Sequence, residues 1–70
     1  MKALSGKEMC KLLERNDWIL KRIKGSHHIY MKHGREETIS VPVHGNRTLK
    51  IGMQKAILKL AGINIEQSDY

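Results

Sequence analysis

The sequence has few of the residues that cross-link or anchor a small protein. Cys10 is the single cysteine of the 70-residue chain, so no internal disulfide can form, and one unpaired thiol is typical of a reducing cytoplasm. The N-terminal segment lacks the apolar run of a secretion signal, and no stretch approaches the ~20 apolar residues that a membrane span requires. These absences predict one cytoplasmic domain, residues 1–70, that lies outside the membrane.

Acidic residues are also scarce. Seven Asp and Glu stand against 13 Lys and Arg, which gives a formal net charge of +6 and a pI near 9.8. No acidic residue occurs between Thr38 and Ile65. The cations form two clusters: Lys21, Arg22 and Lys24 before a glycine, and Arg47, Lys50, Lys55 and Lys59 in the acid-free stretch. Such a balance indicates a polyanionic partner, most often a nucleic acid.

Two segments have the patterning of helices. Ser5 followed by Glu8 matches a capping box, apolar residues recur behind it at helical spacing, and Asn16-Asp17 is expected to end this first helix. A second helix is expected to begin at residue 51 or 52 and to end at Gly62, which has the position of a C-terminal cap glycine. Its expected inward stripe consists of Met53, Ala56, Ile57 and Leu60.

Three short runs between the helices, separated by glycine turns, have the composition of strands: residues 18–23, 27–32 and 38–43. Pro42 cannot donate a ladder hydrogen bond, which places the third run at a sheet edge. The pattern predicts an α+β fold of order α-β-β-β-α, a three-stranded antiparallel sheet with both helices on one face. Residues 64–70 are expected to form a frayed tail.

His27 and His28 are adjacent where a glycine turn meets the second predicted strand. Histidine can both take and give a proton near neutral pH. Alternation along a strand puts His28 with Tyr30, and His27 with Ile29 and Met31. Because the apolar pair is expected to face the helices, alternation favours His28 on the open face, although a bulge at the turn could re-aim His27.

Three motifs follow one another in the chain: Gly25-Ser26-His27-His28, Val41-Pro42-Val43-His44 and Lys59-Leu60-Ala61-Gly62-Ile63. In these motifs the chain resembles the HicA-type toxins, bacterial messenger-RNA interferases with a fold like the double-stranded-RNA-binding domain. The resemblance implies an endoribonuclease that arrests translation, and a HicB-type antitoxin that covers its active face. The family's catalytic histidine follows the glycine turn and maps onto His27 or His28. Gly-Ser-His, the commoner form in the family, favours His27, and His28 remains beside it.

RNA carries its own nucleophile, so one histidine can serve as the base toward the 2′-OH. Arg22, Lys24 or Lys50 can stabilise the charge on the phosphorane, and His44 is the remaining candidate for the acid. Tyr30 can stack on a base. The predicted RNA-binding residues are Arg22, Lys24, Gly25, Ser26, Tyr30, Arg47, Lys50 and Lys55.

The four histidines lack the i, i+4 spacing and the companion carboxylates or thiolates of a metal site. We therefore expect a metal-independent endoribonuclease without a cofactor, monomeric alone and heteromeric with its antitoxin. Two alternatives remain. The same fold and charge suit a non-catalytic RNA-binding module, or a subunit whose basic face only docks on an acidic protein.

Overall fold

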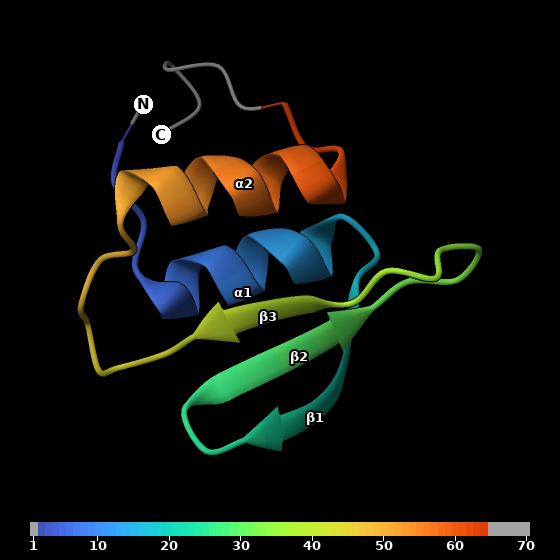
Figure 1. The fold of residues 1–70 in the computed structure, drawn as a ribbon, viewed down its shortest axis with the longest axis horizontal. Coiled ribbons are helices and arrows are strands. Elements are labelled where there is room, and N and C mark those ends of the chain that lie inside the picture. Colours follow the sequence, from blue (N-terminus) through green and yellow to red (C-terminus); the bar gives the residue numbers. More distant parts are fainter. Residues whose placement is uncertain (1, 65–70) are drawn as a thin grey trace.

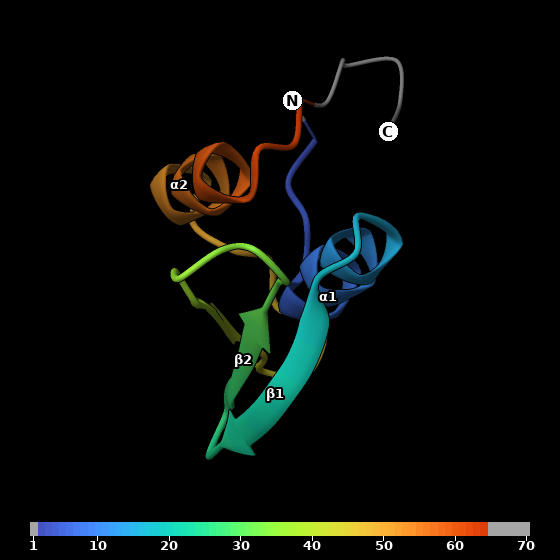
Figure 2. The ribbon, with the colours of Figure 1, turned by 90° about the vertical axis from the view of Figure 1, so that its right-hand side faces the viewer.

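The computed structural model describes residues 2–64. Its elements follow in the order α1 (Gly6–Arg15), β1 (Ile19–Lys24), β2 (His27–Met31), β3 (Ile39–Pro42) and α2 (Ile51–Ala61), which confirms the predicted α-β-β-β-α fold. Both helices lie on one side of the sheet (Figure 1, Figure 2). Apart from Asn64, the tail expected at residues 64–70 lies outside the described residues. Within residues 2–64, no helix has the length and apolar character needed to cross a membrane.

Ser5 begins α1 as predicted. Its hydroxyl accepts a hydrogen bond from the Glu8 N–H over 3.1 Å, and the Glu8 carboxylate accepts one from the Ser5 N–H over 2.9 Å. The hydrogen bond to the Ser5 backbone lowers the pKa of Glu8. At the other end, Asp17 adopts a left-handed φ of 70°, and Trp18 turns into the core with 2% of its surface exposed. Both predicted ends of this helix are confirmed.

The strands form an antiparallel meander in the order β1-β2-β3. Gly25, at a φ of 60°, allows the tight turn between β1 and β2. The edge position that Pro42 predicted for β3 is confirmed. A bulge interrupts the register between Leu20 and Arg22, so Lys21 has no partner in β2. As a result, the side chains before and after Lys21 do not follow one unbroken alternation.

The side chains of β2 alternate as predicted, but each set lies on the opposite face of the sheet from the predicted one. Tyr30 and Ile39, only 1% and 2% exposed, pack in the core beneath the helices. Ile29 and Met31 point to the helix-free face, so the expectation that they face the helices is wrong. Tyr30 fills more of the core than they would, and its hydroxyl donates to the Glu14 carboxylate of α1 over 2.6 Å. This bond satisfies the one polar atom of the side chain.

Helix α2 begins and ends as predicted, but the face that it buries differs from the predicted one. Its buried residues are Gln54, Ile57, Leu58 and Ala61. The predicted stripe is wrong at Met53, Ala56 and Leu60, which are exposed. The amide of Gln54 accepts a hydrogen bond from the Leu4 N–H over 2.7 Å and donates to the Lys2 carbonyl over 2.8 Å. Because these two bonds hold Gln54 inside, α2 is turned by one residue, about 100°, relative to the predicted stripe.

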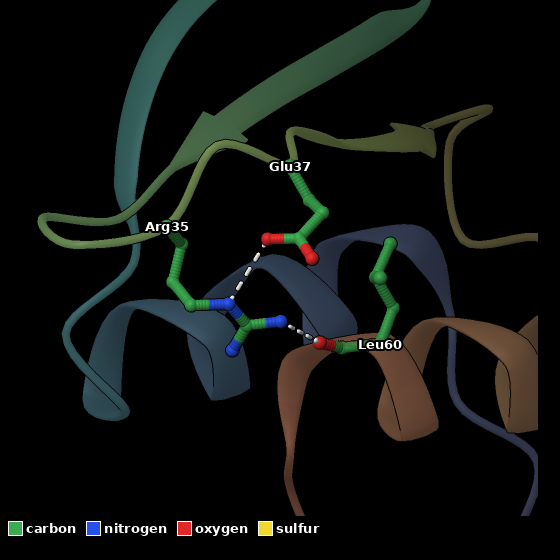
Figure 3. Close-up of polar contacts among 3 residues, drawn as sticks. All are labelled: Arg35, Glu37 and Leu60. Carbon is green, nitrogen blue, oxygen red and sulfur yellow. Dashed lines mark hydrogen bonds and ion pairs between the residues drawn. The ribbon is translucent and has the colours of Figure 1, made fainter.

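The C-terminal end of α2 is fixed by its cap and by the loop after β2. Gly62 adopts the left-handed conformation, with a φ of 72°, and Ile63 packs against the core, as predicted. Arg35 donates to the Leu60 carbonyl over 2.8 Å and pairs with Glu37 at 3.0 Å (Figure 3). A cation therefore lies where the helix dipole is negative, which stabilises this end of the helix.

Candidate active site

The register of the sheet separates the two histidines. His27 lies opposite Pro42 and His28 lies opposite Val41, and consecutive strand residues point to opposite faces. Val41 is fully buried, so His28 shares the helix-side face and is half-buried, whereas His27 is exposed on the helix-free face. The alternation argument, which placed His28 on the open face, is therefore wrong.

On the helix-free face, His27 lies among cations. Its Nδ1 atom shares a hydrogen bond of 3.1 Å with the Ser40 hydroxyl. Lys24 lies opposite His27 across the β1–β2 hairpin, and Arg22 lies opposite Ile29 two residues further along β2. Side chains at such positions share one face. This face therefore brings together His27, Arg22 and Lys24 of the residues predicted from the sequence.

On the helix side, His28 lines a hollow between α1 and the β1–β2 hairpin. The hollow has a volume of about 360 Å³ and is lined by Lys7, Cys10, Lys11, Glu14, Leu20, His28, Tyr30 and Val43. Lys7 and Lys11 are four residues apart and so lie on one face of α1. Neither lysine was among the residues predicted from the sequence, although their helical spacing was a signal that could have found them.

The imidazole of His28 has an unused polar atom. Its Nδ1 is buried and has no hydrogen-bond partner among the described residues. Leaving such a group unpaired costs about 1–3 kcal/mol, and an unpaired buried group in a native structure calls for an explanation such as strain, a catalytic role or a bound water or ion. His28 is thus the histidine that combines a concave surface, two neighbouring lysines and unsatisfied hydrogen-bonding capacity.

Two other groups in the hollow are held neutral. Burial and the hydrogen bond to Glu14 raise the pKa of the Tyr30 phenol, and burial raises the pKa of the Cys10 thiol. Neither side chain is therefore a ready nucleophile or base near neutral pH. Since Tyr30 is only 1% exposed, its ring offers no free face on which a base could stack, and this burial does not fit the stacking role predicted from the sequence.

Two contacts fix the place of the hollow: the close packing of Gly6 and a hydrogen bond at the Gly25-Ser26 turn. A Cβ atom on Gly6 would collide with the Pro42 carbonyl and approach the Val43 Cα within 3.0 Å. The first turn of α1 therefore lies directly against the end of β3. The Ser26 carbonyl accepts a hydrogen bond from the Val43 N–H over 2.8 Å, which ties the Gly25-Ser26 turn to the same place.

The remaining predicted residues lie elsewhere. His44, Arg47 and Lys50 line a second hollow of about 230 Å³ beside the start of α2, so the structure does not bring His44 into the hollow of His28. Lys55 is exposed on α2, and His33 is exposed in the turn after β2. Within residues 2–64, no three His, Cys, Asp or Glu side chains gather in a way that could hold a metal ion.

Comparison with known proteins bears on this arrangement. No curated protein matches the chain. The family model described as HicA toxin of bacterial toxin-antitoxin matches residues 6–63. The match begins with α1 and ends just after α2, so it includes the sheet, both central histidines and both lysines of the hollow. The chain therefore belongs to the HicA toxin family, the toxin component of bacterial toxin–antitoxin systems, and an antitoxin is its partner.

Proposed function

We propose that this toxin is a metal-independent endoribonuclease that cleaves messenger RNA in the bacterial cytoplasm, with His28 as the general base. The observation that carries the proposal is the place of His28 in a hollow beside Lys7 and Lys11, with its Nδ1 unpartnered. His27, the other candidate, is exposed and already shares a hydrogen bond with Ser40. It is the alternative base if the helix-free face is where RNA binds.

The reaction needs little from the protein because RNA supplies the attacking group. His28 takes the proton of a 2′-OH, the 2′ oxygen forms a bond to the adjacent phosphorus, and the bond to the 5′ oxygen breaks. The leaving 5′ oxygen takes up a proton from water, and the proton on His28 returns to the solvent, so the products are a 2′,3′-cyclic phosphate and a 5′-hydroxyl. General-base assistance of this kind contributes about 10²–10⁴-fold.

Lys7 and Lys11 could stabilise the negative charge that develops in this reaction. Both are carried by α1 at the wall of the hollow, where an ammonium group can stabilise the extra negative charge on the phosphorane. Among the described residues, Glu14 is the only carboxylate in the lining, and it accepts a hydrogen bond from the Tyr30 hydroxyl over 2.6 Å. The predicted cations outside the hollow would then hold the RNA backbone: Arg22, Lys24, Arg47, Lys50 and Lys55, beside the turn residues Gly25 and Ser26.

The proposed partner is a HicB-type antitoxin with an acidic binding surface. A chain of net charge +6 attracts an acidic protein over long range, which makes association fast and dependent on salt. The antitoxin would silence the toxin by keeping RNA from His28. We propose that the toxin is monomeric alone and forms a heteromeric complex with this partner.

The experiment that tests the proposal analyses the ends of the cleavage products. Purified toxin should cut RNA in the presence of EDTA, leave cyclic phosphate and 5′-hydroxyl ends, and fail on DNA or on RNA methylated at the 2′ oxygens. Fragments with a 5′-phosphate, or activity that EDTA abolishes, would contradict the role of the 2′-OH. Salt-dependent RNA binding without any cleavage would favour the non-catalytic RNA-binding module.

A further inference from the structure

Strand β1 is an open edge of the sheet. All six of its residues, Ile19 to Lys24, are exposed, and β2 is its single neighbour in the described part of the chain. Figure 1 shows β1 at the lower edge of the sheet with no other element beyond it. An edge strand presents a row of unpaired N–H and C=O groups, which can pair with a strand from another chain.

Apolar side chains accompany these backbone groups. Ile19, Leu20 and Ile23 are 49%, 40% and 55% exposed, three of the six exposed large hydrophobic residues among those described. Because Leu20 lies opposite Tyr30 and Ile23 opposite His28, both are on the helix-side face, whereas Ile19 lies opposite Met31 on the other. A strand that paired with β1 would therefore find apolar contacts on both faces.

The charge of β1 selects the partner. Lys21, Arg22 and Lys24 give the strand three cations and no anion. A second copy of this chain, paired edge to edge, would bring two such clusters together at a cost in free energy, because like charges across a strand pair are destabilising. An extended segment that carries Asp or Glu between its apolar residues meets the same edge with complementary charge.

The opposite edge is less suitable. β3 has four residues against six in β1, and Pro42 removes one backbone donor from it. The bulge at Lys21 limits pairing of β1 with a flat strand of another molecule, yet it leaves residues 22–24 regular, beside the hairpin turn. The edge of β1 is thus the stronger docking surface.

We infer that the antitoxin binds by adding an extended, acidic segment to β1 as a fourth strand. This inference rests on the proposed antitoxin partner and not on the cleavage chemistry. Alternate side chains of the added strand fall on the helix-side face beside Leu20 and Ile23. Leu20 also lines the hollow of His28, so a segment docked here lies at the entrance of the proposed site and can exclude RNA.

The test is amide hydrogen exchange on the complex of the toxin with its antitoxin, the protein that we expect the neighbouring reading frame to encode. Strand addition should slow exchange of the outward-facing amides within residues 19–24 by at least about tenfold, because they gain backbone hydrogen bonds. A complex that forms but leaves these amides unprotected would overturn the inference and leave the antitoxin partner intact. Failure of the two proteins to associate would contradict the antitoxin proposal itself, together with this inference.

A pair of charge-matched variants tests the surface independently. K21E/R22E on β1 should weaken the complex by about tenfold or more, whereas K55E/K59E, with the same change in net charge on the exposed side of α2, should weaken it much less. Equal weakening would mean that only overall charge matters and would overturn the inference. Protection of residues 19–24 by RNA, with none by the antitoxin, would assign this edge to RNA and also overturn it.

Discussion

His27 and His28 are neighbours in the chain, yet the sheet holds them on opposite faces, the first opposite Pro42 and the second opposite Val41. One RNA phosphodiester cannot meet both side chains from one side. The helix-side hollow gives His28 two lysines and a concave surface, while His27 shares a hydrogen bond with Ser40 in the open. Because the two side chains lie on opposite faces, we do not expect them to act together as an acid–base pair, and each can be tested alone.

Removing a cation of the hollow should weaken RNA binding. K7Q and K11Q should each raise the KM for RNA, and each should reduce the slope of log K against log salt by roughly 0.7 if the lysine neutralises one phosphate. K59Q is the matched control, since Lys59 is exposed on α2 away from the lining of the hollow. A larger effect of K59Q than of K7Q and K11Q would place the RNA elsewhere.

Gly6 should tolerate no side chain. In G6A the new methyl group meets the Pro42 carbonyl and the Val43 Cα, so stability should fall by about 1–3 kcal/mol, as in other overpacked sites. G52A is the control: a Cβ there has no atom within 4 Å, and alanine favours a helix by up to about 1 kcal/mol over glycine. Urea unfolding followed by Trp18 fluorescence measures both. Equal stability of the two variants would mean that α1 does not pack against β3 this closely.

The orientation of α2 depends on Gln54. Q54L leaves the buried Leu4 N–H without its acceptor and should cost about 1–3 kcal/mol in the free energy of unfolding. M53A, one residue away at an exposed position, should change it by no more than about 0.5 kcal/mol. Thermal or urea unfolding of the two variants gives the comparison. If M53A proved the more damaging, the stripe predicted from periodicity would be the true inner face.

The predictions that the structure confirms concern local features of the backbone. The capping box at Ser5, the glycine turn at Gly25, the edge strand at Pro42 and the cap at Gly62 are all confirmed. Each depends on the backbone of a few consecutive residues, where local chemistry decides the conformation. The order of elements and the fold class follow from them.

The errors share a different cause. Periodicity counts apolar residues, but the structure also buries the polar groups of Tyr30 and Gln54, because each side chain finds a distant partner for its polar atoms. Those partners, Glu14 and Leu4, are 16 and 50 residues away in the chain, so no local pattern indicates them. Because the faces of β2 were predicted the wrong way round, the hollow beside His28 was not predicted, and neither was the part of α1 that carries Lys7 and Lys11.

Acid should destabilise the toxin partly through Glu8. Its pKa is lowered from 4.5, chiefly by the hydrogen bond from the Ser5 backbone. A carboxyl whose pKa is lower in the folded state contributes stability above pH 4.5, and this contribution is lost as the pH falls through the lowered pKa. E8Q keeps a hydrogen-bonding side chain at this position but cannot ionise. Its Tm should lie below that of the parent at pH 7 and should approach it toward pH 3, whereas a constant difference would contradict the linkage.

The most direct test of the central claim compares H28A with H27A in RNA cleavage and growth arrest, with circular dichroism to verify that each variant is folded. The account predicts that H28A loses about 10²–10⁴-fold in kcat, and that H27A retains most of its activity. H33A, at an exposed turn position, should behave like the parent. Full activity in H28A with loss in H27A would move the site to the helix-free face, and a doubly substituted H27A/H28A toxin that still cut RNA would contradict histidine catalysis altogether.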